Sequence, residues 1–569
     1  MHRRNVWLIT IRTASRCFRG VVIRASDDSY RGTTAQTHRR PQKRTRLTRA
    51  ALVALAFILA VNASPRGTFA QTTDPNPKPP LLWTEPETGQ VFTKPGPGRV
   101  PFTPSGAPPN EQSESQLKAL QHDLEQLHQQ LQKGGIQLGA VNLKLGGFVE
   151  MAGIYRTRNE VSDVGSDYNQ GIPFRILPQA HENETRFSAR QSRLSLLTTG
   201  DVSPDTHLAA YFETDFLDSA TNSNSRESNS YALRMRNIYA TVDKDNWGPH
   251  LGGQTWGFHF LGGQSWSLIT TNTTGIMPRQ EQVPLTIDAQ YVEGFNWLRV
   301  PQFRIVQDFG AGVWAGVSAE SPNMVTSPIT APANTNFNNP GNPAGLLNNA
   351  TTYSTDYIPD FIGKIALDPG FGHYEFKSLI RVFESRTGNT HNSTVGYGFG
   401  GAARLPIMPP YVEVQLSGLG GYGIGRYASG QLPDAAFDAN NTLVAIPELQ
   451  GMAGILSHPW PGNDLYLYGG WEHADRAGAH TVSGYGSPTL IVAGCNTEGA
   501  PSGTCQAETR DLKQITGGFW QDIYKGNYGR FTVGFEGGYI WRDAFSGVGG
   551  APKTNIGIFM TSVRYYPYS

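Results

Sequence analysis

Residues Tyr231–Gly257 read YALRMRNIYATVDKDNWGPHLGGQTWG, and this stretch decides the fold. At its start, Leu233 and Met235 alternate with Arg234 and Arg236. A period of two predicts a strand with one apolar face and one face of guanidinium groups. In a soluble sheet the apolar face would cover a core, whereas in a transmembrane barrel it would meet lipid and the arginines would face a wet lumen. The stretch alone allows both structures.

Composition favours a large β-rich body. The 569 residues include 65 glycines and 11% aromatic residues, and only 16% are charged. No apolar run reaches the roughly 18 residues that a membrane-spanning helix needs. The sequence therefore excludes a membrane helix bundle and leaves an all-β fold.

Residues 1–70 have the features of an extended leader. They contain 14 of the 47 Lys and Arg residues and two of the 46 acidic residues. A basic segment, the apolar run Ala50–Val61 and small residues up to Ala70 predict a secretory signal, with a short buried helix as the alternative. Removal of residues 1–70 leaves 33 basic and 44 acidic groups. This acidic balance argues against nucleic acid as a partner.

Two segments separate this leader from the rest of the chain. Residues 71–112 are rich in proline and predict a disordered tether. In residues 113–135, leucines spaced three and four apart predict a short coiled-coil helix, which needs the rest of the protein to gather the chains. An amphipathic helix packed on its own domain is the alternative. The leucines are Leu117, Leu120, Leu124, Leu127 and Leu131.

Residues 136–569 contain sixteen strand-like runs whose connections alternate between short and long. This layout is typical of a 16-stranded antiparallel transmembrane β-barrel, which has tight periplasmic turns, long external loops and an even strand count. A soluble sandwich gives no reason for loop length to alternate. The predicted long connections are 157–183, 219–230, 259–294, 320–356, 385–392, 426–448, 476–506 and 542–554.

Charged residues concentrate on the second to sixth strands and form the candidate site. Inward arginines facing carboxylates in a narrow lumen would create a transverse field that favours charged solutes, although the same charges could simply form ion pairs along the wall. Arg193 has the opposite parity to its neighbours and requires a bulge or a periplasmic position. The loop 259–294 is the candidate constriction. The predicted pore-lining residues are Arg186, Arg190, Arg234, Arg236, Glu213, Asp215, Arg279, Arg299 and Arg304.

The remaining reactive side chains predict one disulfide and no catalytic centre. Cys17 lies in the leader, so Cys495 and Cys505 are expected to form a disulfide in an exported chain. No Ser/His/acid set, metal-binding spacing or nucleotide motif has the context that its chemistry requires. We therefore expect neither an enzyme nor a metal or other cofactor.

An ordered set of motifs resembles the DcaP-like trimeric outer-membrane porins of Gram-negative bacteria. After the tether and the leucine repeat, the motifs are GGFVEMAGIYR (146–156), TRFSARQSRLSL (185–196), YFETDF (211–216), LRMRNIYATV (233–242) and GQTWG (253–257). The resemblance implies a barrel in the outer membrane, three chains per assembly, an N-terminal coiled coil in the periplasm and an inward-folded third loop. It also implies a pore for small anions such as dicarboxylates, with Arg186, Arg190, Arg234 and Arg236 on its basic wall.

These expectations combine into a passive porin surrounded by outer-membrane lipid. A barrel plugged by its loops, tethering the outer membrane to peptidoglycan through the N-terminal segment, is the alternative.

Overall fold

The computed structural model describes residues 83–84, 91–92, 100–101, 135–219, 231–248, 255–327, 332–340, 352–479 and 483–568. The chain divides into two compact units, Met1–Pro108 and Pro109–Ser569. In the first unit, β1 (Trp83–Thr84) pairs with β2 (Val91–Phe92) and β3 (Val100–Pro101), within the segment predicted to be a tether. The predicted leader (1–70) and the predicted coiled-coil helix (113–135) lie outside the described residues.

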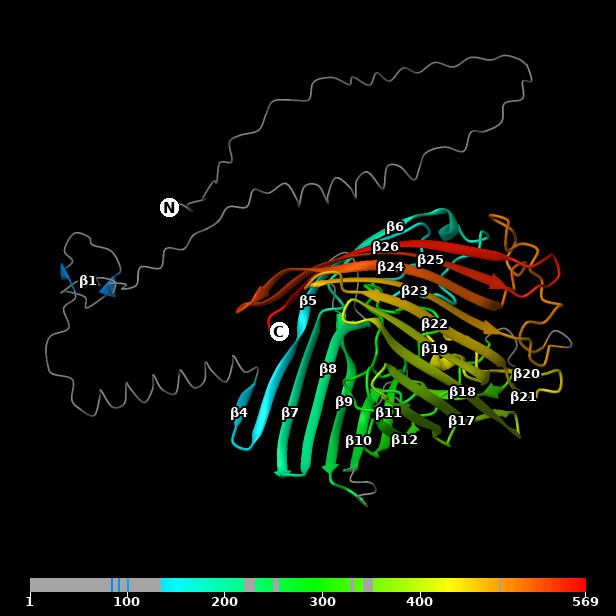
Figure 1. Cartoon of the computed structure of the whole chain (residues 1–569). Helices are drawn as coiled ribbons and strands as arrows, with labels where there is room; N and C mark the ends of the chain where they lie inside the picture. Colours follow the sequence, from blue (N-terminus) through cyan, green and yellow to red (C-terminus); the bar gives the residue numbers. More distant parts are fainter. Residues whose placement is uncertain are drawn as a thin grey trace, which may run out of the picture. The chain divides into compact units, whose positions relative to one another are not determined.

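The second unit is a closed antiparallel barrel, which confirms the predicted all-β fold (Figure 1). Among the described residues, sixteen long strands form the ring, because β6 and β7 together act as one strand beside β5. The strands are β5 (Val141–Arg156), β6 (Glu184–Ser188), β7 (Arg193–Ser203), β8 (Thr206–Ser219), β9 (Tyr231–Asp245), β10 (Gly257–Trp266), β11 (Arg299–Asp308), β12 (Val313–Glu320), β16 (Asp360–Leu367), β17 (His373–Thr387), β18 (Thr390–Met408), β19 (Val412–Tyr422), β22 (Pro447–Ser457), β23 (Asn463–Ala474), β24 (Thr509–Gly526), β25 (Gly529–Ala544) and β26 (Lys553–Tyr566).

Shorter elements decorate this ring. The strands β4 (Ile136–Leu138) and β13 (Thr335–Asn336) extend it by pairing with β5 and β17. Two small hairpins, β14 (Asn338–Pro340) with β15 (Thr352–Ser354) and β20 (Ala435–Phe437) with β21 (Leu443–Ala445), belong to the connections. So do the 3-10 helices η1 (Pro178–His181) and η3 (Gly425–Tyr427). No helix in the described part of the chain is long and apolar enough to cross a membrane.

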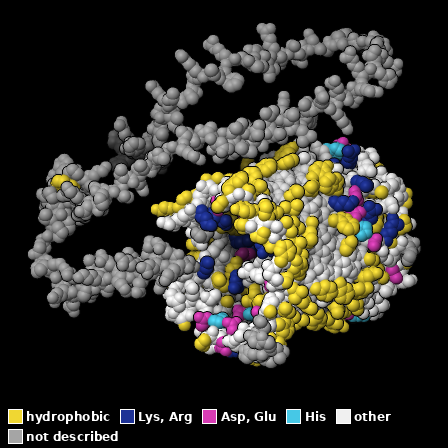
Figure 2. Space-filling view, viewed as in Figure 1, with side chains coloured by type: hydrophobic (Ala, Val, Ile, Leu, Met, Phe, Trp, Pro, Cys, Tyr) yellow, Lys and Arg dark blue, Asp and Glu magenta, His cyan; other side chains and the backbone are white. Residues whose placement is uncertain are grey.

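The outer face of the barrel is apolar and the inner face is polar or packed. Along β5, Val149 and Met151 are 62% and 52% exposed, whereas Glu150 and Ala152 between them are 2% and 0% exposed. Figure 2 shows hydrophobic side chains covering much of the visible outer face. Because a soluble surface this apolar would aggregate, the pattern indicates strands whose outer side faces lipid.

The opening stretch shows the same division along β9. Leu233 and Met235 are exposed on the outside, while Arg236 is buried and Arg234 half-buried on the inside. The alternation predicted from the sequence is therefore confirmed. Thr255 and Trp256 precede the next strand, because β10 begins at Gly257.

Connections at one end of the barrel, which we call the turn end, are mostly short, and those at the other end, the loop end, are mostly long. The prediction of a long loop at residues 385–392 is wrong. Most of these residues belong to strands, because β17 reaches Thr387 and β18 starts at Thr390, so the connection has only two residues. Gly388 has a φ of 58°. A positive φ at the first turn residue is what a tight hairpin of this length requires, and glycine adopts it without a steric penalty.

The third long connection occupies residues 267–298, which we call the third loop. The predicted start at residue 259 is too early, because His259–Trp266 pair with β9 and β11 as part of β10. The predicted end at 294 is also early, since β11 begins at Arg299. The start was misplaced because the inward side of β10 includes glycine and serine, which hide the alternation.

A charge on the outer face should destabilise the barrel according to its depth in the membrane. Ile380 lies at the centre of β17 and is 55% exposed. We expect Ile380→Arg to lower the free energy of unfolding from lipid vesicles by about 2–4 kcal/mol, and Tyr374→Arg, near the turn end of the same strand, by about 0–1 kcal/mol. Denaturant titration of vesicle-inserted protein measures both, and equal losses would contradict a lipid-facing β17.

Candidate functional site

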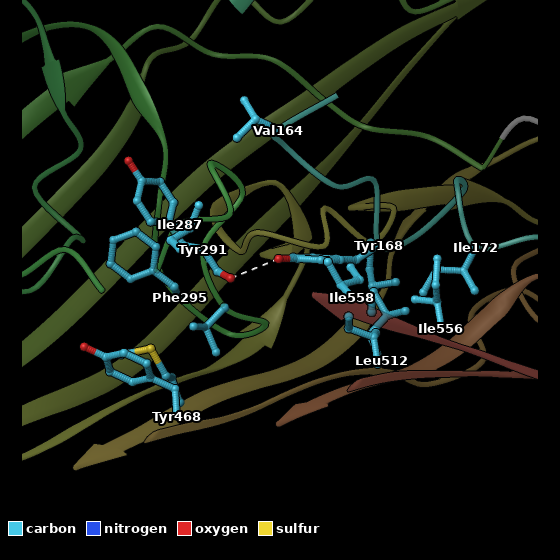
Figure 3. Close-up of a cluster of buried hydrophobic side chains, with 14 of the residues drawn as sticks. Val164, Tyr168, Ile172, Ile287, Tyr291, Phe295, Tyr468, Leu512, Ile556 and Ile558 are labelled. Atoms are coloured by element: carbon cyan, nitrogen blue, oxygen red, sulfur yellow. Dashed lines mark hydrogen bonds between the residues drawn. The ribbon is translucent and has the colours of Figure 1, made fainter. Parts of the chain in front are cut away.

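Much of the lumen is filled by an apolar core, which we call the plug core. Among the described residues five connections contribute to it, chiefly the first loop (157–183), the third loop and the sixth loop (423–446), with Ala477 and Tyr485 of the connection 475–508 and Phe545 of the connection 545–552. Tyr168 of the first loop packs with Tyr291 and Phe295 of the third loop, and the Tyr168 hydroxyl donates to the backbone carbonyl of Tyr291 at 2.9 Å (Figure 3). Inward side chains of the wall, such as Leu512 and Ile556, close the other side. Apolar contacts thus hold three loops inside the barrel.

Carboxylates of the wall bind the backbone of the third loop. Each accepts a hydrogen bond from an N–H group that a loop leaves without a partner of its own. Glu472 also accepts from Gly430 of the sixth loop at 2.8 Å, so one side chain joins two loops to β23. The contacts with the third loop are Leu268 to Glu320 (2.8 Å), Asn272 to Glu375 (2.7 Å), Ile287 to Glu536 (2.6 Å) and Gly294 to Glu472 (2.8 Å).

Glu293 of the third loop lies beside Glu472 and is fully buried. Burial raises the pKa of Glu293 well above its ordinary value, and the neighbouring Glu472 carboxylate raises it further. Two adjacent buried carboxylates repel each other when both are ionised, so the pair favours the state in which one of them carries a proton. The junction between the third loop and the wall therefore carries less negative charge than its composition indicates.

Strands β6–β9 carry the predicted charged residues as a continuous ladder, which we call the charged wall. Arg234 makes a two-pronged contact with Asp215, at 3.0 and 2.8 Å, and Arg236 contacts Glu213 at 2.6 Å and Asp215 at 2.9 Å. The acidic residues lie on β8 directly beside the arginines of β9, not across the lumen from them. Nearer the loop end, Arg186 pairs with Glu184 and Arg190 with Asp163, each at 3.1 Å.

Arg193 also belongs to the charged wall. It pairs with the inward-facing Phe148 in the ladder, because residues 189–192 interrupt the strand between β6 and β7 and reset its parity. Its guanidinium lies 3.7 Å from Glu213. The break supplies the irregularity that the sequence parity of Arg193 requires.

The remaining predicted residues surround the third loop. Arg279 is exposed at the tip of this loop and donates to the hydroxyl of Tyr239 at 3.2 Å. Arg299 lies over the ring of Trp266 at 4.5 Å. Arg304 is 3% exposed and donates to Gln302 and to the backbone carbonyl of Trp266. It therefore fixes the residue that directly precedes the third loop.

Tyr291 is a residue of this region that sequence reasoning missed. Burial opposes its ionisation, but Arg236, Arg299 and Arg193 outweigh burial and lower the pKa of Tyr291 to about 7. No sequence pattern marks it, because its arginine neighbours come from β7, β9 and β11. Arg530 and Arg564, which line a cavity at the turn end, were missed for a similar reason.

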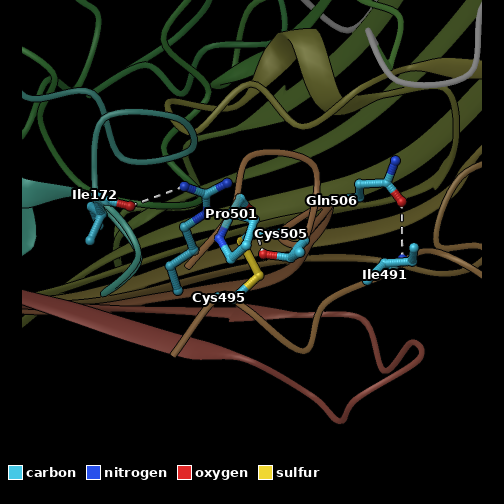
Figure 4. Close-up of a disulfide and its surroundings, with 8 residues drawn as sticks. Ile172, Ile491, Cys495, Pro501, Cys505 and Gln506 are labelled. Atoms are coloured by element: carbon cyan, nitrogen blue, oxygen red, sulfur yellow. Dashed lines mark hydrogen bonds between the residues drawn. A yellow bond between two sulfur atoms is a disulfide. The ribbon is translucent and has the colours of Figure 1, made fainter. Parts of the chain in front are cut away.

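The seventh loop (475–508) contains the disulfide between Cys495 and Cys505, with Cα atoms 4.7 Å apart (Figure 4). Near it, Arg542 of β25 donates to the backbone carbonyl of Ile172 at 3.0 Å, which joins the first loop to the wall. Within the described residues, no group of three or more His, Cys, Asp or Glu side chains has an arrangement that could hold a metal ion.

These features define a sixteen-stranded barrel with loops folded into its lumen. The outer membrane channel DcaP of Acinetobacter baumannii has a similar structure, with a TM-score of 0.55 and 18% identity over 76% of this chain and 100% of that chain. An anion-selective porin from Comamonas acidovorans matches with a TM-score of 0.41 and 10% identity over 75% and 99% of the two chains. OmpF of Salmonella typhi in complex with daunomycin matches with a TM-score of 0.41 and 9% identity over 76% and 99%.

No protein-family profile and no curated protein matches the sequence. The similarity to DcaP establishes the fold. At the level of the fold, it confirms the family resemblance that the sequence motifs predicted.

The charged wall should lose positive charge when Tyr291 ionises. We expect one of the 23 tyrosines to titrate near pH 7, three units below the ordinary value, because three guanidinium groups stabilise its phenolate. Tyrosinate absorbance in the near ultraviolet measures this step. Tyr291→Phe should remove it and the outward-facing Tyr397→Phe should retain it, so a step that survives Tyr291→Phe would contradict the assignment.

Proposed function

We propose that this chain is an outer-membrane porin, a passive channel for small hydrophilic solutes that favours anions such as dicarboxylates. The charged wall is the observation that carries this proposal, since it remains partly open where the plug core covers other parts of the lumen. The side chains of Arg186 and Arg234 are 37% and 34% exposed. The fold of a solved outer-membrane channel and the apolar outer face support the same conclusion.

Passage along the charged wall would favour anions because the arginines outnumber their carboxylate partners. A guanidinium matches a carboxylate with two parallel hydrogen bonds, which suits a dicarboxylate moving from one arginine to the next. Ion pairing within the wall keeps each contact weak enough for release. The basic groups along this path are Arg186, Arg190, Arg193, Arg234 and Arg236 of the charged wall and Arg279 of the third loop, and the carboxylates that pair with them are Asp163 of the first loop and Glu184, Glu213 and Asp215 of the wall.

The proposal includes the cellular setting. The turn end faces the periplasm and the loop end faces the exterior of a Gram-negative cell, as in other outer-membrane barrels. Residues 1–70 direct export, and residues 113–135 form a periplasmic coiled coil between three chains. Mass measurement of the detergent-solubilised protein, with and without residues 113–135, tests the homotrimer and the contribution of the helix.

Removing one charge from the wall should weaken the anion preference. A unit charge about 8 Å from an ion in water contributes roughly 0.5 kcal/mol, with opposite sign for an anion and a cation, so we expect Arg234→Ala to lower the anion-to-cation permeability ratio about fivefold. Arg236→Ala should act in the same direction. The reversal potential of planar bilayers in a salt gradient measures the ratio.

Arg386→Ala is the matched control, because Arg386 is exposed at the loop end of β17 and, within the described residues, donates to the nearby carbonyl of Gly388 at 3.2 Å. A cation preference of the unmodified protein, or equal ratios for Arg234→Ala and Arg386→Ala, would overturn the anion preference.

The plug core favours a second candidate, a loop-plugged structural barrel that tethers the outer membrane to peptidoglycan. Its central residues Ile287, Val292 and Leu512 are fully buried, so no water-filled passage crosses them. Bilayers without stepwise conductance, together with binding of the 71–133 fragment to isolated peptidoglycan, would establish this candidate and reject the porin. Stepwise conductance would reject it.

A further inference from the structure

A row of large side chains crosses the outer face of the barrel near its loop end. Cross-strand pairing aligns Trp471 of β23 with Lys513 of β24, and Lys513 with Trp541 of β25. All three side chains are exposed on the outer face. Tryptophan on the outer face of a membrane barrel marks the depth at which hydrocarbon meets the polar headgroups. The row therefore places a lysine at the depth of the headgroups.

Lys513 extends from this row towards the loop end. Its Nζ lies 3.0 Å from the carboxylate of Asp543, which is the next outward residue of β25 after Trp541. Lys553 of β26 approaches the same carboxylate at 3.7 Å. A lysine surrounded by lipid is expected to direct its charge away from the hydrocarbon in this way. The charge thus reaches the plane of the headgroups.

Two arginines continue the basic surface beyond the row. Arg510, near the start of β24, donates through Nε to Asp511 at 2.6 Å. Arg476 of the seventh loop donates through Nη2 to the carbonyl and the hydroxyl of Ser546, at 2.9 Å each. Both arginines line an open cavity of about 470 Å³. Asp475 also lines this cavity and has the outward parity of β23, so the cavity lies on the outer side of the rim.

These four basic residues form what we call the basic rim patch, which exposes its cations and covers most of the neighbouring carboxylates. Asp511 and Asp543 are 7% and 10% exposed, beneath the cations that contact them. Asp475 is open and lies 3.2 Å from Nε2 of His473. Figure 2 shows Lys and Arg side chains gathered with acidic ones at the right-hand end of the visible outer face. The patch consists of Arg476, Arg510, Lys513 and Lys553.

Apolar surface continues directly below the row of Trp471 and Lys513. Ile515 of β24 pairs with Tyr539 of β25 one step nearer the turn end, and both side chains are exposed on the outer face. A free anion would leave this surface uncovered, whereas hydrocarbon chains would cover it. The ligand that fits both surfaces has an anionic headgroup and acyl chains.

Phosphate is the anion that suits the basic rim patch best. Arginine binds phosphate oxygens with two parallel hydrogen bonds, and basic side chains clustered beside a membrane bind phosphorylated lipid headgroups. In the cellular setting proposed above, the loop end faces the exterior of the cell. The lipid in contact with the patch is then a phosphorylated glycolipid of the outer leaflet.

We propose that the basic rim patch binds the phosphate groups of such a glycolipid, with its acyl chains lying along Ile515 and Tyr539. The assignment to the outer leaflet rests on the proposed function, whereas recognition of a phosphorylated lipid does not.

Native mass spectrometry of the purified full chain in detergent tests the proposal, because it counts the lipid molecules on the intact protein. The probes are diphosphorylated lipid A, the same lipid after removal of its phosphates, and inorganic phosphate. We expect lipid A to bind and the dephosphorylated lipid to bind about tenfold more weakly. An excess of inorganic phosphate should leave the lipid A bound, because it lacks the acyl chains.

Removing one cation from the patch should weaken the binding of lipid A about fivefold, which is the contribution of one basic side chain beside a charged membrane surface. We expect this loss for Arg510→Gln and for Lys513→Gln. Lys513→Arg should bind as the unmodified protein does, because it retains the charge. Arg386→Gln is the matched control, since Arg386 is exposed at the loop end of β17 and lies outside the patch.

The proposal is overturned if dephosphorylated lipid A binds as tightly as lipid A, a comparison that needs no variant to fold. It is also overturned if Arg510→Gln and Lys513→Gln both bind lipid A as the unmodified protein does, or if Arg386→Gln loses as much binding as they do. Displacement of lipid A by inorganic phosphate would assign the patch to a free anion. Fewer chains per assembly in Arg510→Gln, with lipid binding unchanged, would make the patch a contact between chains.

Lipid binding does not depend on conductance, so the two proposals fail separately. Silent bilayers with phosphate-dependent lipid binding would reject the porin alone. Selective conductance without such binding would reject this patch alone.

Discussion

The pairing of β26 with β5 is the interaction on which the rest of the structure depends. Eight residue pairs, from Ile558 and Arg156 to Tyr565 and Val149, join the last long strand to the first. Closure leaves no sheet edge, so the backbone of every strand can be paired within lipid. It also fixes which side of each strand faces inward, and this decides where an ionisable side chain can be placed.

A closed ring of sixteen strands encloses more space than its own side chains can fill. In this chain the loops fill much of that space, and burial of apolar side chains in the plug core holds them there. On the inward side of the barrel wall, carboxylates accept hydrogen bonds from loop backbone N–H groups, and arginines pair with charged loop residues. Along β6–β9, where arginines and acids alternate between neighbouring strands, the side chains of Arg186 and Arg234 stay partly exposed.

The periodicity of two and the alternation of loop lengths were enough to predict the barrel, its strand number and the inward position of Arg234 and Arg236. Both signals are local, so they can be seen in one strand or one connection at a time. The same locality explains the errors. Gly388 shortens a connection that looked long, and glycine and serine in β10 hide a strand that looked like loop.

The site was less predictable because its contacts join residues far apart in the chain. Arg236 was assigned to a basic wall, but its acidic partners on β8 could be placed only with the register of β8 against β9. The three arginines that lower the pKa of Tyr291 come from three different strands. Arg530 and Arg564 lie on the two neighbouring strands β25 and β26, and nothing in their local sequence indicates a shared cavity.

The barrel wall anchors the third loop through the backbone of the loop, which leaves the exposed side chains at the loop tip free to vary. Glu320, Glu375, Glu472 and Glu536 bind backbone N–H groups, which every residue except proline provides. These hydrogen bonds need no particular side chain, whereas the bound residues themselves are fixed by packing: Leu268, Asn272 and Ile287 are buried, and Gly294 has a φ of 75°. Exposed residues at the tip, such as Arg279 and Gln280, can be exchanged while the loop keeps its path. A new preference could therefore be engineered, or could evolve, by substituting a few tip residues on an unchanged scaffold.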